Sequence, residues 1–234
     1  MKYNQIINNL NLLIDSGIRE FLEDSPQKYY NAKNEKNLYK DNLNKIKDLS
    51  ELEIAIKNFN GCNLKNSAKN TVFADGNPNA KVMFIGEAPG KDEDIKGIPF
   101  VGLAGQLLDK MLFSIKLDRS KVYITNIIPW RPPGNRQPTT QEMLLCVPFI
   151  QKHIELVRPK ILVLLGGTAT KALLLLDEGI MKSRGKWHKY SSYGLANPIL
   201  TRAIFHPAFL LRSPSYKKLA WEDLKEIEKK LNDN

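Results

Sequence analysis

Four short stretches of the sequence combine glycine, proline and isolated polar side chains, a composition typical of ligand-binding loops. They are residues 86–105, Asn126 with 129–138, Gly166-Gly167, and 206–214. In the first stretch, two carboxylates, Glu87 and Glu93, accompany the apolar run Pro99-Phe100-Val101. Polar groups beside an apolar and aromatic wall are typical of a small-molecule pocket. This combination suits a planar, uncharged ring as the ligand.

The first stretch has only a superficial likeness to a phosphate-binding loop. GEAPGK, residues 86–91, is one residue too short for that motif, and Asp92 stands where a magnesium-binding Ser or Thr is required. Pro89 also removes one backbone donor. A nucleotide-hydrolysing enzyme therefore stays only as a third alternative.

Each of these stretches follows a segment whose continuous apolar run predicts a buried strand. The predicted strands are 81–86, 121–126, 160–166 and 199–205, and the predicted helices are 51–59, 104–115, 139–157, 168–175 and 216–231. Such alternation indicates a parallel sheet with helices on both faces. We predict an α/β fold of three layers, α/β/α, around a central, mainly parallel four-stranded sheet. Ligands bind beyond the carboxyl ends of such strands, where the four stretches converge.

The first 50 residues differ in character from the remainder. Residues 6–22 predict an amphipathic helix interrupted at Ser16-Gly17, and residues 23–44 read as a polar linker. We therefore predict a helical extension and linker in residues 1–50 and one catalytic domain in residues 51–234.

The composition of the chain indicates the type of partner and the cellular compartment. The 234 residues carry a formal net charge of +10, which favours a polyanionic partner, although a merely solvated lysine-rich surface is the alternative. No apolar run reaches the ~20 residues of a membrane helix, and MKYNQIINNLNLL lacks the pattern of a signal peptide. Two cysteines make no disulfide framework. We expect a cytoplasmic protein that binds no membrane and is a monomer.

Five ordered motifs identify a family resemblance. They are GEAPGKDEDIKGIPFVGLAGQLLDKML, VYITNIIPWRPPGNRQPT, ILVLLGGTATKALL, RGKW and FHPAFLLRSPSYKKLAWEDL. Together they resemble the type 4 uracil-DNA glycosylases over residues 62–224. The resemblance implies an enzyme that flips uracil out of DNA and hydrolyses its N-glycosidic bond.

The resemblance also implies roles for three pocket residues. Phe100 would stack on the flipped uracil. Asn126 would pair with the base edge, because an amide offers a donor and an acceptor together, although an Asn that ends a strand in a turn is the ordinary alternative. His206 would face a uracil carbonyl, where negative charge develops as the bond breaks. We take His206, Asn126 and Glu87 as the catalytic residues.

The resemblance implies roles near the uracil for further residues of the motifs. In the related type 1 enzymes a carboxylate lies where Ala88 falls, and alanine cannot activate water, so Glu87 would assist instead. Glu93 would hinder the methyl group of thymine, and Asn135 would line the pocket.

The last motif resembles the loop that enters DNA. Leu210 would fill the gap left by the flipped nucleotide, with Leu211 as the alternative. Basic residues would contact phosphates, namely Arg212, Lys217 and Lys218, with Arg131 and Arg136 beside the second motif.

The chain departs from the family at the iron–sulfur ligands. Most members hold a 4Fe–4S cluster with four cysteines, of which Cys62 matches the first and Cys146 the fourth. Lys65 replaces the second and Trp130 the third. Two thiolates fall short of the usual four ligands, so we expect no cluster and no other cofactor. Packing around Trp130, together with the N-terminal extension, would take over its structural role; alternatively, the two cysteines would remain near each other as a remnant of the site.

We therefore predict a monofunctional glycosylase whose partner is uracil-containing DNA, because no lysine matches a nucleophile position. A protein that recognises uracil or damaged DNA with little or no turnover is the alternative. Ala88 and the missing cluster ligands keep that alternative open.

Overall fold

The computed structural model describes residues 43–233, so the predicted helix at 6–22 and most of the predicted linker lie outside the described residues. The chain divides into two compact units, Met1–Asn44 and Lys45–Asn234, and the second holds all the predicted site residues. The predicted domain boundary at residue 50 stays a prediction.

A mixed sheet of six strands forms the centre of this unit. The strands are β1 Asp75–Gly76, β2 Val82–Gly86, β3 Val122–Asn126, β4 Ile161–Leu165, β5 Trp187–Tyr190 and β6 Ile199–Ile204, in the order β1-β3-β2-β4-β6-β5. The four central strands are parallel, which confirms the predicted fold class. The predicted number of four was too small, because β1 and β5 add short antiparallel edges.

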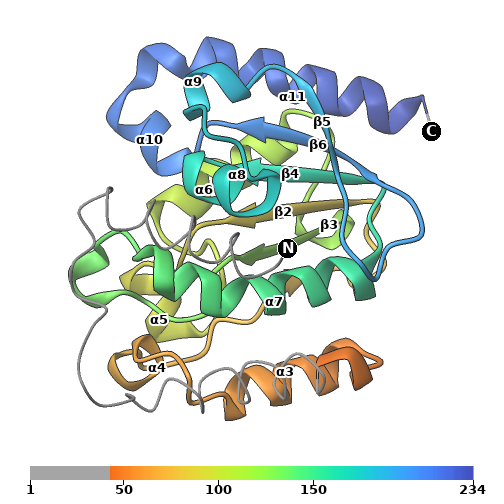
Figure 1. The fold of residues 1–234 in the computed structure, drawn as a ribbon. Helices are drawn as coiled ribbons and strands as arrows, with labels where there is room; N and C mark the ends of the chain where they lie inside the picture. The colour runs from red at the N-terminus through yellow and green to blue at the C-terminus, as the bar shows by residue number, and fades with distance from the viewer. Residues whose placement is uncertain (1–42, 234) are drawn as a thin grey trace, which may run out of the picture. The chain divides into compact units, whose positions relative to one another are not determined.

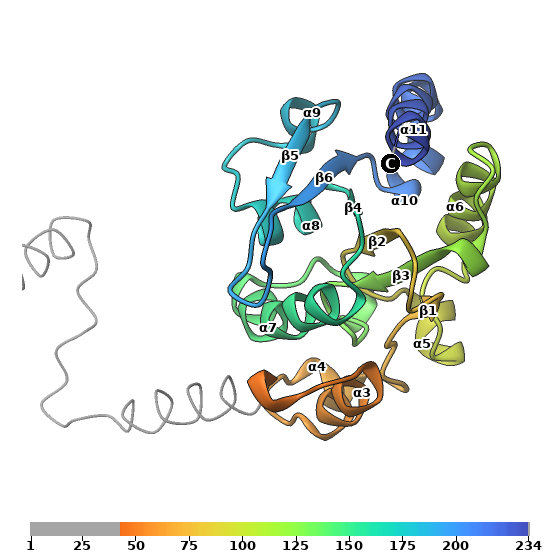
Figure 2. The ribbon, with the colours of Figure 1, turned by 90° about the vertical axis from the view of Figure 1, so that its right-hand side faces the viewer.

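Helices cover both faces of the sheet (Figures 1 and 2). They are α3 Leu49–Asn58, α4 Leu64–Ser67, α5 Lys91–Lys96, α6 Leu103–Phe113, α7 Thr140–Val157, α8 Gly167–Leu174, α9 Ile180–Ser183, α10 Pro207–Arg212 and α11 Lys217–Asn232, with 3-10 turns η1 Arg119–Lys121, η2 Pro133–Asn135 and η3 Pro214–Tyr216. Within residues 43–233, none of the helices has the length and apolarity needed to cross a membrane.

The strands bury both faces because their side chains alternate between them. Phe84 and Val163 join one hydrophobic core with residues of α6 and α11. On the other face, the Tyr123 hydroxyl lies 3.0 Å from Nδ1 of the buried His153 in α7. Near-continuous apolar strands are therefore consistent with a layer of helices on each side.

Side chains cap the starts of two helices. Asp48 accepts a hydrogen bond of 2.8 Å from the backbone N–H of Glu51 at the start of α3. Thr139 and Glu142 form a reciprocal capping box at the start of α7, with bonds of 3.2 and 2.7 Å. The helices predicted at 51–59 and 139–157 are thus present as α3 and α7.

Candidate active site

The candidate site lies at the carboxyl edge of the parallel strands. β2 and β3 pair in register, so that their last residues, Gly86 and Asn126, lie opposite each other. β4 and β6 pair as the next parallel strands, and His206 lies two residues beyond the end of β6. Figure 1 shows α5, α8 and α10, which follow these strands, at this end of the sheet. The sheet thus brings the first, second and fourth predicted loops to one edge.

Asn126 places a buried amide at this edge. The residue is 5% exposed, and its Oδ1 has no hydrogen-bond partner among residues 43–233. A Cβ at Gly86 would overlap Asn126 Oδ1 and the ring of Phe100, so only glycine lets both approach the strand. A buried acceptor left unpaired costs roughly 1–3 kcal/mol. A ligand N–H donor would remove that cost.

Phe100 forms an aromatic wall next to the amide. It is buried and has a φ of 55°, in the left-handed region that residues with a Cβ rarely adopt. Its ring centroid lies 5.7 Å from that of His206, with an angle of 32° between the planes. A non-glycine residue in this region costs on the order of 1–3 kcal/mol, so surrounding contacts must hold it.

His206 caps the start of α10, and its capping hydrogen bond determines which ring nitrogen carries the proton. Nδ1 accepts a hydrogen bond of 3.1 Å from the backbone N–H of Ala208. An accepting ring nitrogen carries no hydrogen, so the neutral ring holds its proton on Nε2. Burial, with a smaller contribution from the charge of Arg212, lowers the pKa of His206 to about 4. At neutral pH the ring is therefore an uncharged donor through Nε2.

Glu87 follows β2 directly and is half-buried, as is Ala88. The hydroxyl of Thr168, in the first turn of α8, donates a hydrogen bond to Glu87 Oε2. Thr168 is a site residue that the sequence reasoning missed. Its only signal was its place directly after Gly166-Gly167 at a strand end.

Glu93 lies behind the aromatic wall. It is 8% exposed, and its carboxylate accepts hydrogen bonds from the backbone N–H groups of Gly90, Val101 and Gly102 at 3.1, 2.9 and 2.9 Å. Both oxygens are thus occupied by the loop itself. This placement favours a positioning role over the direct contact with the base that the sequence predicted.

The loop around η2 is tied together by its own side chains. Asn135 is exposed, and its Oδ1 accepts a hydrogen bond of 2.6 Å from Nε of Arg131. Arg136 makes two hydrogen bonds to the carboxylate of Glu142, at 2.9 and 2.7 Å. These contacts give Asn135 a loop partner instead of the predicted pocket position. They also leave Arg131 the less neutralised of the two arginines.

The structure distinguishes the two leucines that the sequence offered for insertion into DNA. Leu210 is 1% exposed and belongs to the hydrophobic core, whereas Leu211 is 42% exposed. Adjacent residues of a helix point in directions about 100° apart, so one of the two must face outward. Arg212, which follows Leu211, and Lys217, at the start of α11, are also exposed. Leu210, the first choice, is therefore part of the core, and Leu211, the alternative, is the leucine whose side chain is exposed.

The two cysteines lie together in a region that we call the cysteine region, formed by Phe59, Cys62, Trp130, Cys146 and Phe149. Both thiols are buried and free. A hydrogen bond with Cys146 lowers the pKa of Cys62 to about 7, and the same bond, with burial, raises the pKa of Cys146. The expectation that the two cysteines remain close is confirmed.

The residues at the other two ligand positions do not fit an iron–sulfur cluster. Nζ of Lys65 donates to Oδ1 of Asn60 at 2.9 Å. Trp130 is 1% exposed, and its indole N–H donates to Oγ1 of Thr71 at 3.0 Å. Among residues 43–233, no group of three or more His, Cys, Asp or Glu side chains is placed to hold a metal ion.

Aromatic side chains pack together in the cysteine region. The Phe59 ring stacks on Trp130 at a centroid distance of 6.3 Å and meets Phe149 edge-on at 5.1 Å. The predicted hydrophobic packing around Trp130 is confirmed.

Comparison with known proteins assigns the fold and its site to a class. Residues 73–225 match the family model of the uracil DNA glycosylase superfamily, and the chain belongs to that superfamily. It is 40% identical over 197 residues to the type-4 uracil-DNA glycosylase of Saccharolobus solfataricus, covering 82% of this chain and 88% of that protein.

Two further relatives of the same name come from other organisms. The type-4 uracil-DNA glycosylase of Archaeoglobus fulgidus is 38% identical, over 78% of this chain and 92% of its own length. That of Thermotoga maritima is 37% identical, over 74% and 89%. Within the superfamily, these similarities place the chain in the type-4 family.

Proposed function

We propose that this protein removes uracil from DNA by hydrolysing the bond between base and sugar, which leaves an abasic site and begins base excision repair. The observation that carries the proposal is the buried, unpaired Oδ1 of Asn126 beside the wall formed by Phe100. The shared family and the names of the relatives support the same activity.

Recognition of uracil follows from the chemistry of the amide. Oδ1 of Asn126 would accept the N3–H of uracil, and Nδ2 would donate to O4. Cytosine presents an acceptor at N3 and an amino group at position 4, so both contacts would become mismatched. A site built to hydrogen-bond one edge rejects the other because it leaves buried polar groups unpaired.

Bond cleavage requires stabilisation of the departing base. As the bond between C1′ and N1 breaks, its electron pair moves to the base and positive charge develops on the sugar. The neutral imidazole of His206 would donate from Nε2 to the uracil oxygen O2, where part of the negative charge collects. Water then bonds to C1′ and loses a proton. Glu87, which is held by Thr168, would orient that water because Ala88 has no group able to do so.

DNA would lie across the exposed end of α10. Leu211 would occupy the space of the flipped nucleotide, and the basic side chains of Arg212 and Lys217 would contact phosphates. Arg131 would add a phosphate contact beside η2. Arg136 contributes less charge because Glu142 neutralises it. The net charge of +10 supports this orientation of the chain toward a polyanion.

We infer that the protein works without an iron–sulfur cluster. Contacts of Lys65, Trp130 and the paired thiols within the chain support this inference, because these residues satisfy one another. Iron and sulfide analysis of protein purified without oxygen tests it. We expect no stoichiometric iron, and one cluster per chain would contradict the inference.

We also propose that the protein acts as a monomer in the cytoplasm. A chain of 234 residues with only two cysteines has no disulfide framework, which supports a reducing compartment. Sedimentation of the purified chain, free and with DNA, measures the oligomeric state.

The decisive experiment measures free uracil released from a labelled oligonucleotide that contains one uracil, with EDTA present. The wild type is compared with His206→Ala and Asn126→Ala. Metal-independent release that falls at least ~10²-fold in both variants supports the proposal. Tight uracil-dependent binding without release would replace the enzyme with a damage-recognition protein.

A further inference from the structure

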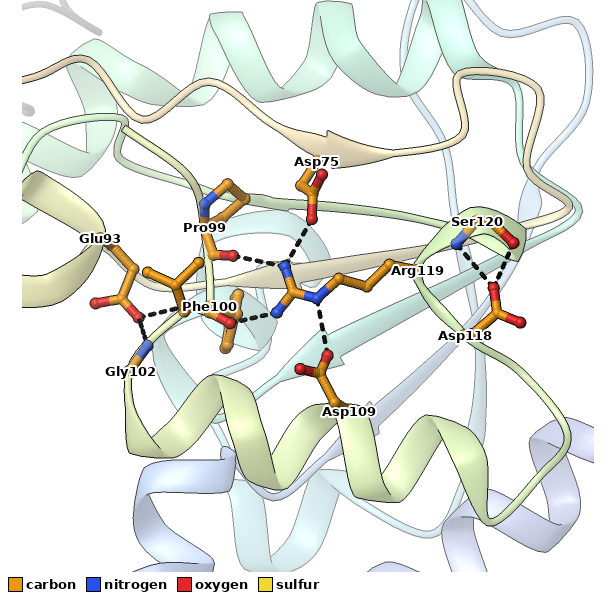
Figure 3. A network of polar contacts seen from close by, with 10 residues as sticks. Asp75, Glu93, Pro99, Phe100, Gly102, Asp109, Asp118, Arg119 and Ser120 are labelled. Atoms are coloured by element: carbon orange, nitrogen blue, oxygen red, sulfur yellow. Dashed lines mark hydrogen bonds and ion pairs between the residues drawn. The ribbon is translucent and has the colours of Figure 1, made fainter. Parts of the chain in front are cut away.

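Arg119 contacts the aromatic wall from outside the pocket. It lies in η1, just before β3, and its Nη1 donates to the carbonyl of Pro99 at 3.1 Å. Its Nη2 donates to the carbonyl of Phe100. Figure 3 shows the guanidinium beside these two consecutive carbonyls. No sequence motif pointed to this residue, which is separated from Phe100 by 19 positions.

Two carboxylates hold the guanidinium in this orientation. Nη1 lies 2.6 Å from Oδ2 of Asp75 in β1, and Nε lies 2.8 Å from Oδ1 of Asp109 in α6. The Arg119 side chain is only 26% exposed. A planar fork fixed on two sides can direct its remaining N–H groups with little loss of entropy. Arg119 is therefore preorganised to bind the carbonyls of the loop.

Glu93 binds the same loop from the opposite side. Its carboxylate accepts the N–H groups of Val101 and Gly102, the two residues that follow Phe100. Figure 3 shows the Glu93 and Arg119 contacts on either side of this short segment. α6 also packs tightly here, because a Cβ at Gly105 would overlap the Phe100 carbonyl. The backbone is thus held immediately before and after its strained residue.

We propose that Arg119 is a positioning residue of the uracil pocket: it holds Phe100 in the left-handed conformation that keeps its ring against Gly86 and close to His206. The inference rests on the proposed function, because it assigns Phe100 to the wall that contacts the base. Glu93 is the complementary half of the same clamp. Neither side chain touches the substrate.

Loss of the clamp has a consequence that can be separated from catalysis. Without Arg119, the backbone at Phe100 is free to return to the more stable region of negative φ. The ring then leaves the pocket, and uracil loses a stacking surface. His206 keeps its own contact with Ala208. Binding of the base should therefore weaken more than the rate of the chemical step.

The test compares Arg119→Gln and Arg119→Lys with the wild type. KM, kcat and the inhibition constant of free uracil are measured at equal concentrations of active sites. For Arg119→Gln we expect the inhibition constant and KM to rise about tenfold, the effect of losing a charged hydrogen bond, with a smaller change in kcat. Arg119→Lys keeps the charge but not the fork, so its values should be intermediate.

The matched control is Lys116→Met, which removes an ion pair of 3.1 Å with Glu228. It should leave KM, kcat and the inhibition constant at their wild-type values. A purely structural role for Arg119 would lower the melting temperature and the fraction of active protein but leave the inhibition constant unchanged. That result would overturn the inference.

A double-mutant cycle with Phe100→Ala tests whether Arg119 acts through the ring. In the Phe100→Ala background, Arg119→Gln should change the inhibition constant by less than about twofold. A full tenfold effect in that background would overturn the inference while leaving the glycosylase intact. If the wild type neither releases nor binds uracil, the proposed function fails first and the clamp loses its role with it.

Discussion

The candidate active site and the cysteine region differ in whether their buried polar groups have hydrogen-bond partners. At the site, Oδ1 of Asn126 is unpaired and Phe100 has a φ of 55°. In the cysteine region, the indole N–H of Trp130 donates a hydrogen bond, and the two free thiols are hydrogen-bonded to each other. The comparison indicates that the site gives up stability to remain ready for a ligand, while the cysteine region contributes stability. Substitutions should therefore have opposite consequences in the two places.

The largest effect should come from Asn126→Leu. Removing the buried unpaired acceptor while keeping an apolar side chain of similar size should raise the free energy of unfolding by about 1 kcal/mol. The same change should lower kcat/KM for uracil release by about 10⁴-fold, because the base edge loses its partner. Urea unfolding and uracil release measure the two quantities.

The matched control for Asn126→Leu is its neighbour Thr125, whose hydroxyl donates to the carbonyl of Phe73 at 2.6 Å. Thr125→Val should lower stability by about 1 kcal/mol and leave kcat/KM near the wild-type value. A loss of stability in Asn126→Leu comparable to that in Thr125→Val would contradict the contrast between the two regions.

Trp130→Ala should have the next largest effect and the opposite pattern. The side chain is fully buried against Phe59, so its removal leaves a cavity and should cost about 3–5 kcal/mol. KM for the protein that remains folded should not change. Trp221→Ala is the control, because that side chain is 41% exposed and should cost much less. Similar losses in both variants would argue against a stabilising role for the cysteine region.

The pH dependence sharpens the comparison further. The pKa of His206 is about 4, so the donor stays neutral above that pH. We expect kcat/KM to show no inflection from His206 between pH 5 and 8, and to fall as pH approaches 4. An inflection near 6.5, the ordinary histidine value, that disappears in His206→Gln would show an unshifted imidazole.

Folding stability should respond to the same shift with a defined sign. Between about pH 6.5 and 4 the unfolded chain binds a proton at His206 that the folded chain does not, so stability falls as pH falls through this window. His153, whose pKa burial lowers to about 3, acts in the same direction. His206→Gln should reduce the slope of melting temperature against pH, and an unchanged slope would count against the shift.

The smallest effect should come from Cys146→Ala. Without the thiol that donates to Cys62, the pKa of Cys62 should rise from about 7 toward the ordinary value near 8.5. Ultraviolet absorbance of the thiolate during a pH titration measures this change. Uracil release should stay at the wild-type rate. A large loss of activity would show that a substitution in the cysteine region affects the active site.

The sequence predicted the strands and helices whose residues follow a simple hydrophobic pattern. Strands such as 160–166 are continuous apolar runs, and the helix at 139–157 has both a period and a cap, so their existence follows from local chemistry. β5 escaped prediction because WHKY is short and polar and is held by pairing with β6. The resemblance of the motifs indicated which residues at the strand ends could act in the site. The parallel arrangement of the sheet indicated that those ends lie at one edge.

The remaining features depend on tertiary contacts that no local pattern records. Leu210 and Leu211 are the same residue type in adjacent positions, and only packing of α10 against the core decides which is buried. The sequence does not show that Glu93 binds its own loop, because its partners, the N–H groups of Val101 and Gly102, become close only after the loop folds. Arg119 was missed for the same reason.

The short helix α10 joins two tasks in one rigid body. His206 is its first cap, bonded to the N–H of Ala208, and Leu211 and Arg212 stand at its other end, only about 9 Å along the axis. A shift of the far end of α10 would therefore also shift the imidazole. If DNA binds at that end, as the proposed function expects, contact with the backbone on either side of the uracil and the position of the Nε2 donor would be mechanically coupled.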